Sequence, residues 1–212
     1  MTLRLHEIFY SLQGESSRVG LPTVFVRLTG CPMRCVYCDT AYAFNGGQTT
    51  PISEIMERVS SYGARYVTVT GGEPLAQKNC LVLLKQLCDA GYEVSLETGG
   101  AIDTSEVDAR VAVILDVKTP GSGEMEKNLW ANLDHLKPAD EVKFVLCNRA
   151  DYDWAKNILS EHAINRKCSV LFSPVYQDVN PTDLAEWILE DKLPVRMQMQ
   201  LHKILWGEVA GK

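Results

Sequence analysis

The stretch "TGCPMRCVYCDT", residues 29–40, sets Cys31, Cys35 and Cys38 in the spacing C-x3-C-x2-C. The next cysteine in the chain, Cys80, lies far outside this stretch. Structural zinc sites close with four protein ligands, and a [4Fe–4S] cluster needs a ligand on each of its four irons. Three thiolates on one short loop therefore leave one coordination position open. An open position is where a metal centre binds a substrate or cofactor.

Two other interpretations of the cysteines stay open at this point. A zinc site would need a fourth ligand from a histidine such as His6, His135 or His162, or from another cysteine. The three cysteines would otherwise be buried residues without a metal. The total of seven cysteines is odd and favours metal or redox chemistry over a disulfide framework. Core packing is the predicted role of the remaining four, Cys80, Cys88, Cys147 and Cys168.

The composition is that of an ordinary globular protein, with 46% hydrophobic and 23% charged residues. We expect a single domain over residues 1–212, which is long enough to bury a full core. The net charge of −6 argues against a sequence-independent nucleic-acid binder, which needs a basic surface. No apolar run approaches the ~20 residues of a membrane helix, and no signal-peptide core is present. We therefore expect a cytoplasmic protein with reduced thiols.

Short β-rich runs alternate with helical patterns along the chain, which predicts an α/β barrel or part of one. Most of these runs are continuously apolar, as in strands buried on both faces of a parallel sheet. Thr50 followed by Pro51 is predicted to cap and start a helix, and Asn180 with Pro181 repeats this signal. The predicted strands are 23–28, 66–70, 93–97, 111–117, 141–146, 169–172 and 195–200.

Polar sequences follow these strands at their C-terminal ends. The carboxyl ends of parallel strands meet on one face, and that face carries the chemistry of α/β barrels. We therefore expect one active site built from all of these segments. They are the cysteine loop after 23–28, "TGGEP" (70–74), "ETGG" (97–100), "DVKTP" (116–120), "SP" (173–174), and "QLHK" (200–203), whose His202 and Lys203 would close the last strand.

Together these segments resemble a known family. C-x3-C-x2-C is similar to the signature of the radical S-adenosylmethionine (SAM) enzymes, in which SAM is the ligand of the open iron. The further segments "SLQGES" (11–16), "FVRLTGC" (25–31) and "CDT" (38–40) precede the strand-end sequences in the same order as in the 7-carboxy-7-deazaguanine synthases. The resemblance covers nearly the whole chain, from about Leu5 to Trp206.

The resemblance implies an α/β fold, a single-domain incomplete (β/α)6 barrel of the radical SAM type with its cluster-binding loop at 31–38. It implies a lyase that converts 6-carboxy-5,6,7,8-tetrahydropterin to 7-carboxy-7-deazaguanine with release of ammonia, in queuosine-type deazapurine biosynthesis. The implied cofactors are a [4Fe–4S] cluster, SAM, whose reductive cleavage yields a 5′-deoxyadenosyl radical, and Mg2+. The implied partners are an external reductase such as a flavodoxin and a second copy of the chain in a homodimer, without a membrane or nucleic acid.

The resemblance also implies roles for individual residues. Arg27 would bind the substrate carboxylate; a buried arginine needs an anionic partner, and a structural salt bridge is the alternative. Thr40 would be a ligand of Mg2+, and Glu73 an acceptor for the ammonium of SAM. The implied pterin-binding residues are Leu12, Gln13, Gly14, Glu15, Arg27 and Thr70. The implied cofactor contacts are Tyr37, Cys38, Asp39, Gly72, Glu73, Lys118, Thr119, Ser173, Pro174, Val175 and Tyr176.

Two rival functions share some of these features. A glycyl-radical-enzyme activase has the same cysteine motif, but it needs a surface for a protein partner and consumes SAM stoichiometrically. A non-enzymatic zinc-binding module would use the cysteines alone. "LQGE" and Arg27 favour a small carboxylated substrate over the protein partner of an activase. Metal analysis and a visible spectrum of anaerobically prepared protein would distinguish the zinc-binding module, because zinc is colourless.

Overall fold

The computed structural model describes residues 1–207 and 209–211. Its strands are β1 (Thr2–Leu12), β2 (Pro22–Leu28), β3 (Gln48–Pro51), β4 (Tyr66–Gly71), β5 (Glu93–Thr98), β6 (Ala112–Asp116), β7 (Glu141–Leu146), β8 (Ser169–Pro174) and β9 (Arg196–Met197). Its α-helices are α1 (Ile52–Ser60), α2 (Cys80–Asp89), α3 (Arg149–Glu161), α4 (Pro181–Asp191) and α5 (Leu201–Trp206). Short 3-10 helices include η1 (Ala41–Phe44), η2 (Pro74–Ala76) and η5 (Trp130–His135).

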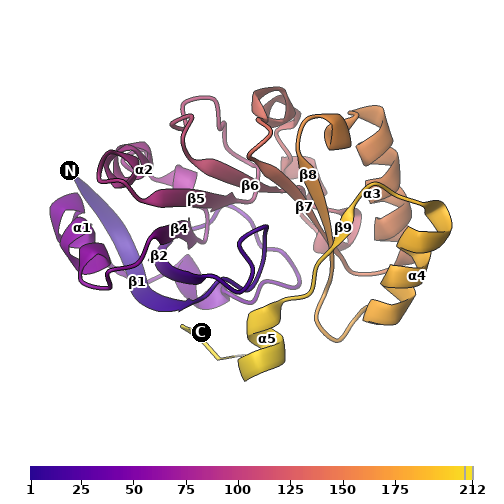
Figure 1. Ribbon diagram of the computed structural model, residues 1–212, viewed down its shortest axis with the longest axis horizontal. Helices are drawn as coiled ribbons and strands as arrows, with labels where there is room; N and C mark the ends of the chain where they lie inside the picture. Colours follow the sequence, from indigo (N-terminus) through magenta and orange to yellow (C-terminus); the bar gives the residue numbers. More distant parts are fainter. Residues whose placement is uncertain (208, 212) are drawn as a thin grey trace.

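Within the described residues, the strands form one sheet in the order β3-β1-β2-β4-β5-β6-β7-β8-β9. β2 and β4 to β9 run parallel, and β1 and β3 add to one edge as antiparallel strands. The sheet bends into an arch that does not close, with α1 to α4 outside it and α5 on the inner side (Figure 1). The predicted incomplete barrel is therefore confirmed. No described helix is long and apolar enough to cross a membrane.

The two faces of the sheet differ in chemistry. In β7, the buried Val142 and Phe144 belong to the apolar core beneath α3 and α4. The alternate residue Lys143 points to the inner face, where its amine bonds to Glu15. The expected burial of the strands on both faces is confirmed in β4 and β8, where consecutive residues are buried, but the inner face is not apolar. Helices cover an apolar outer face, and the inner face carries charges.

Several local predictions need correction. Thr50 does not cap a helix, because it pairs with Leu3 in the β1–β3 ladder, and α1 begins one residue after Pro51. The predicted strand 195–200 keeps only two paired residues, and "QLHK" enters α5 instead of closing a strand. β1 and β3 were not predicted. The Asn180 cap is confirmed, since its side chain accepts from the Thr182 N–H.

Candidate active site

The cysteine loop, residues 29–40, follows β2 and is tied through its backbone to segments far along the chain. The Arg34 N–H donates to Glu124 Oε1 over 2.6 Å, and the Val36 N–H donates to the Ser122 carbonyl over 3.1 Å. Both partners come from the segment after β6. The loop is therefore fixed against the carboxyl ends of the parallel strands.

Cys31, Cys35 and Cys38 are half-buried free thiols on this loop. Burial raises the pKa of the Cys31 and Cys35 thiols, so binding of iron to them would release protons. In the described part of the chain, no three histidine, cysteine or acidic side chains are gathered closely enough to hold a single metal ion, and this includes the three thiols of the loop.

Two glycines let neighbouring turns approach the cysteine loop. A Cβ atom at Gly72, after β4, would clash with the Gly30 carbonyl and lie 2.8 Å from Cys31 Cβ. A Cβ atom at Gly99, after β5, would clash with the end of the Met33 side chain. These glycines form a cradle that any larger residue would open.

Gly72→Ala is expected to lose most of its bound iron and turnover, because the added methyl group would displace Gly30 and Cys31. Iron content after anaerobic reconstitution measures the effect. Gly63→Ala is the control: no atom lies within 4 Å of the added Cβ, although its φ of +61° makes alanine unfavourable. We expect that control to cost about 1 kcal/mol in unfolding free energy and to keep its iron. Equal iron in Gly72→Ala and the wild type would contradict the cradle.

Glu73 joins the turns after β4 and β5. Its buried carboxylate accepts from the Gly99 N–H (2.8 Å), the Leu75 N–H (3.0 Å) and the Thr98 hydroxyl (2.9 Å). Burial raises the pKa of Glu73 despite these donors. The side chain has no exposed surface, so in this conformation it fixes the Gly72 turn and does not face a ligand.

The Thr29 hydroxyl, at the start of the cysteine loop, is buried and lacks a hydrogen-bond partner within the described residues. The same holds for two further oxygens at the loop, the Tyr37 hydroxyl and Asp116 Oδ1. Lys118 lies close to both, with Nζ 3.0 Å from Asp116 Oδ2 and 5.6 Å from the centre of the Tyr37 ring. Burial and the charge of Asp116 raise the pKa of Tyr37, which keeps its hydroxyl protonated. Unsatisfied buried polar atoms are rare, and a cofactor with hydroxyl and ring-nitrogen groups would supply their partners.

The turn after β1 meets the ends of β4 and β5. Gln13 is buried, and its amide donates to Thr68 Oγ1 (3.2 Å) and Glu97 Oε1 (3.3 Å). The Thr70 hydroxyl donates to the other Glu97 oxygen over 3.0 Å. Burial raises the pKa of Glu97, and the nearby Glu15 carboxylate adds to this effect. Glu97 therefore links Gln13 and Thr70, two residues predicted to bind substrate, and Leu12 precedes Gln13 at the end of β1.

Lys143 is the centre of a mostly buried ionic network. Its Nζ lies 2.6 Å from Glu15 Oε2 and 3.6 Å from Asp116 Oδ2. The other Glu15 oxygen accepts from Gln200 Nε2 over 2.7 Å. Burial alone would raise the pKa of Glu15, but the charge and hydrogen bond of Lys143 outweigh it and lower this pKa to about 2. Glu15 is therefore ionised near neutral pH.

Arg27 lies beside Thr70 in the β2–β4 pairing, and Thr40 ends the cysteine loop. Arg27 Nε donates to Glu7 Oε1 over 2.8 Å, so the salt bridge held open as an alternative does form. The Thr40 hydroxyl has only one polar side-chain neighbour among the described residues, Cys38 Sγ at 3.8 Å. Its oxygen lone pairs therefore remain available to a hard cation such as Mg2+.

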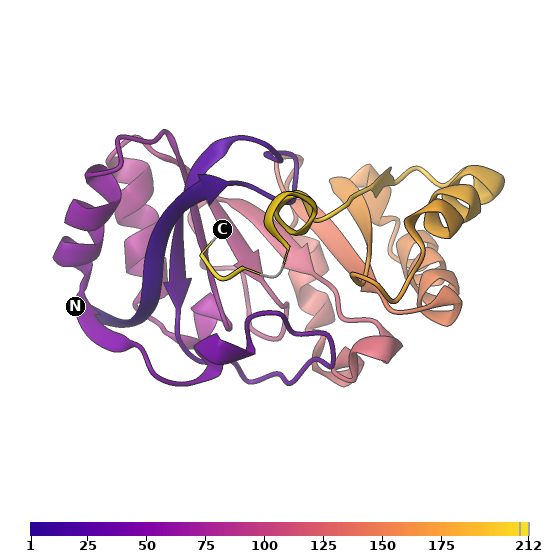
Figure 2. The same ribbon diagram turned by 90° about the horizontal axis from the view of Figure 1, so that it is seen from below.

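Helix α5 closes the inner side of the arch against the β1–β2 turn (Figure 2). The Leu201 N–H donates to the Gly14 carbonyl over 3.0 Å, and a Cβ at Gly14 would clash with the His202 ring. Lys203 Nζ lies 3.2 Å from Asp39 Oδ2 at the far end of the cysteine loop. The segment "QLHK" thus joins the site as predicted, although from a helix.

The cofactor contacts predicted from Thr119 onward are mostly buried side chains. The Thr119 hydroxyl is fully buried and donates to Asp151 at the start of α3 over 2.9 Å. Ser173 and Pro174 form the buried end of β8, and Val175 is also buried. Tyr176 reaches the site edge, where Lys203 Nζ lies 5.5 Å from its ring centre.

The sequence prediction assigned no individual role to five polar residues of the inner face. Two of them, Lys143 and Glu7, stood in no quoted motif. The other three, Glu97, Asp116 and the uncharged Gln200, were quoted only within "ETGG", "DVKTP" and "QLHK". Lys143 and Glu97 would have been found by asking which charges interrupt an apolar strand, as Arg27 does.

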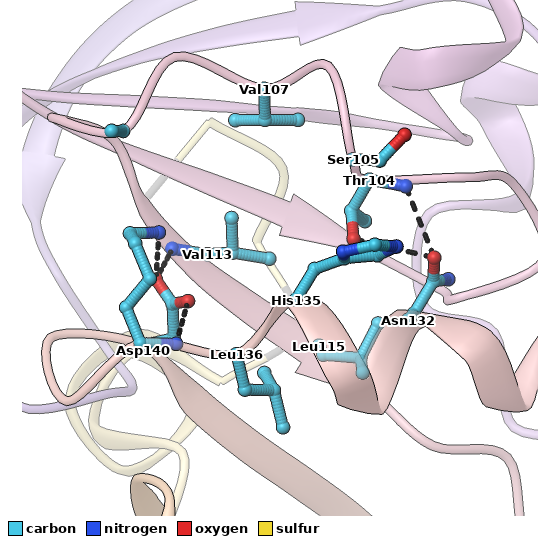
Figure 3. A pocket seen from close by; sticks show the side chains of 11 residues that line it. Thr104, Ser105, Val107, Val113, Leu115, Asn132, His135, Leu136 and Asp140 are labelled. Atoms are coloured by element: carbon cyan, nitrogen blue, oxygen red, sulfur yellow. Dashed lines mark hydrogen bonds and ion pairs between the residues drawn. The ribbon is translucent and has the colours of Figure 1, made fainter.

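A cavity of about 200 Å³ opens elsewhere, on the outer face of β6 where no α-helix follows β5 (Figure 3). Its apolar floor includes Val113 and Leu115, and its polar rim is occupied by internal hydrogen bonds. Asn132 accepts from the Thr104 N–H, and Asp140 accepts from the Val113 N–H. The cavity therefore reflects a missing helix and is separate from the strand-end site.

The chain is similar to known proteins in both sequence and structure. Residues 25–188 match the model of the radical SAM superfamily. The chain is 50% identical to the 7-carboxy-7-deazaguanine synthase of Chlorobaculum tepidum over 97% of this chain and 94% of that protein. It is 42% identical to the synthase of Koribacter versatilis, over 96% and 97% of the two chains. The crystal structure of QueE from Escherichia coli shares the fold, with a TM-score of 0.78 at 23% identity over 95% of each chain.

Proposed function

The chain belongs to the radical SAM superfamily and, within it, to the 7-carboxy-7-deazaguanine synthase family, and from this membership we propose how its residues divide the reaction. It is a lyase of deazapurine biosynthesis that uses a [4Fe–4S] cluster and SAM. The substrate we assign is 6-carboxy-5,6,7,8-tetrahydropterin, converted to 7-carboxy-7-deazaguanine with loss of ammonia. The 50% identity over nearly the full chain carries this assignment.

The cofactor side of the site comprises the cysteine loop and the ends of β4 and β6. Cys31, Cys35 and Cys38 would hold three irons of the cluster, and the fourth iron stays open for SAM. When bound, cluster and SAM supply a hydrogen-abstracting carbon radical. The unpartnered Tyr37 and Asp116 oxygens support a polar cofactor beside the loop.

The substrate side comprises the β1–β2 turn and the inner face of the sheet. The Gln13 amide and the ionised Glu15 would pair with the donor–acceptor edge of the pterin, and Arg27 would bind its carboxylate. Gly14 lets α5 cover this turn and so limits the access of water. The remaining residues of the earlier expectation, Leu12 and Thr70, border the same turn.

The assay that tests this function uses anaerobically reconstituted protein, SAM, a one-electron reductant and the carboxylated tetrahydropterin. We expect 7-carboxy-7-deazaguanine and ammonia in equal amounts, with much more product than 5′-deoxyadenosine because SAM is regenerated. Accumulation of 5′-deoxyadenosine without the deazapurine would overturn the assignment. A glycyl-radical-enzyme activase would give that second result.

Mg2+ is the third proposed cofactor, with Thr40 as its protein ligand. Thr40→Val is expected to lose most of the stimulation of turnover by Mg2+ while keeping iron and SAM binding, because valine retains the shape but lacks the oxygen. Thr40→Ser should remain responsive. The measurement is product formation against Mg2+ concentration for the three proteins. A wild-type response in Thr40→Val would remove Thr40 from the metal site.

We further propose that residues 1–212 form one domain, that the enzyme is a homodimer, and that a flavodoxin-type reductase supplies the electron. The continuous sheet supports the first of these. All seven cysteines are free thiols, which supports a reducing cytoplasmic environment.

A further inference from the structure

Glu7 interacts with Arg27 in an unusual way for a simple structural ion pair. The two residues are directly opposite in the β1–β2 ladder, and the register of β1 shifts between Leu5 and Glu7. Such a bulge at His6 re-aims the following side chains. It brings Glu7 to the inner face beside Arg27, where the Glu7 side chain is 26% exposed and that of Arg27 is 12% exposed.

The contact between Glu7 and Arg27 uses only the Nε atom of the guanidinium. Arg27 Nε donates to Glu7 Oε1 over 2.8 Å, and the Tyr42 hydroxyl donates to the same oxygen over 2.9 Å. Within residues 1–207 and 209–211, neither terminal nitrogen of Arg27 has a hydrogen-bond acceptor. A carboxylate that served only to neutralise Arg27 would gain more from the bidentate geometry that is left unused.

Aromatic rings fix the plane of the same group. The Arg27 guanidinium carbon lies 5.6 Å from the centre of the Phe9 ring and 5.7 Å from that of Tyr42. Phe9 is itself stacked on Phe25, with ring centres 4.9 Å apart. Tyr42 belongs to η1, which begins directly after Thr40. The guanidinium is thus anchored at Nε beside two aromatic rings, while its terminal N–H groups have no hydrogen-bond acceptor among the residues that the structure describes.

We propose that Glu7 is a positioning residue for substrate binding: with Tyr42, it orients Arg27 so that the two terminal N–H groups meet the carboxylate of the substrate. This inference rests on the proposed function. It assigns the preference for a carboxylated pterin to a three-residue unit of Glu7, Arg27 and Tyr42. Without the anchor, Arg27 would still carry its charge but would lose the fixed orientation on which a bidentate contact depends.

The test compares Glu7→Ala, Glu7→Gln and Tyr42→Phe with the exposed control Glu57→Gln, using reconstituted enzyme with verified iron content. Two quantities are measured: KM for the carboxylated tetrahydropterin, and the inhibition constant of a tetrahydropterin that lacks the carboxylate. We expect Glu7→Ala to raise KM about tenfold, the effect of one lost charged contact, and to leave the inhibition constant unchanged. Glu7→Gln and Tyr42→Phe should raise KM by smaller factors, and Glu57→Gln should not change it.

A second comparison uses the Arg27→Ala background, in which Glu7→Ala should add little to the loss of affinity, because both act through one contact. A parallel rise of KM and the inhibition constant in Glu7→Ala would mean general damage to the pocket and would overturn the proposal. Independent, multiplicative effects of the two substitutions would do the same. If Glu7→Ala does not fold, an unchanged KM in both Glu7→Gln and Tyr42→Phe overturns it. Failure of the wild type to convert the carboxylated pterin would remove the proposed function itself.

Discussion

Replacement of any one of Cys31, Cys35 and Cys38 by alanine is expected to abolish both the iron–sulfur cluster and turnover. Reconstituted wild type should bind about four irons and four sulfides per chain, the content of one cubane cluster. Two thiolates on a loop hold such a cluster poorly. The loss of activity should exceed the roughly 10–100-fold effect of removing an outer-shell partner of a metal ligand.

Iron and sulfide analysis with the visible spectrum of anaerobic protein gives the measurement. Cys88→Ala and Cys168→Ala are matched controls, because both cysteines lie outside the loop and should leave iron content unchanged. Full iron content in any of the three loop variants would exclude this ligand set. Loss of iron in a control would instead indicate a further cluster ligand.

Lys143→Met should destabilise the folded chain by about 3–5 kcal/mol, because it leaves the mostly buried Glu15 carboxylate without its cation, whereas Asp116 keeps Lys118. Urea unfolding of the reduced, iron-free protein at neutral pH measures this loss. Lys156→Met removes a more exposed pair with Asp191 and should cost less than about 1 kcal/mol. Similar losses in the two variants would show that the Lys143 network contributes little to stability.

The same network makes stability depend on pH. The pKa of Glu15 is about 2 in the folded chain against an ordinary value of 4.5, so its ionised form stabilises the fold at pH above 4.5. This contribution decreases as pH falls from about 4.5 to about 2. Glu15→Gln lacks the titrating group, so the wild type should lose more stability than this variant over that interval.

The parts of the site that the sequence predicted are those whose signal is local. The cysteine spacing and the strand-end turns are short continuous motifs, and the Asn180 cap is a contact between neighbours. Arg27 was noticed because a charge in an apolar strand needs a partner. The same argument applies to Lys143 in "EVKFVL" and Glu97 in "EVSLET", where charges alternate with buried residues.

β1 was missed because its pattern changes register. Leu3 and Leu5 are buried at the spacing of a strand, but the next buried residue is Ile8, three positions later. The shift in pairing between Leu5 and Glu7 explains this spacing, which interrupts the period of two expected for a strand. Such a break in the pattern can be recognised only when the pairing with the neighbouring strand is known.

The form of "QLHK" depends on contacts that no local pattern contains. The chain leaves β9 after two paired residues, and Leu201 then bonds to the Gly14 carbonyl. The Glu15–Gln200 bond joins residues 185 positions apart. Such pairings depend on the whole fold. The position of this segment at the site was therefore predictable from the sequence, but its secondary structure was predicted wrongly.

This long closure has a consequence for the order of folding. During synthesis, β1 and β2 can pair early. Glu15 can form its contacts only after Lys143, 128 residues later, and then Gln200 have been synthesised. Arg34 on the cysteine loop likewise waits for Glu124, 90 residues later. Contacts of such separation slow folding and leave partly folded states exposed. A nascent chain would therefore expose the three thiols of the cysteine loop well before the contacts that fix this loop can form, so that insertion of the proposed cluster would be favoured only after most of the chain has left the ribosome.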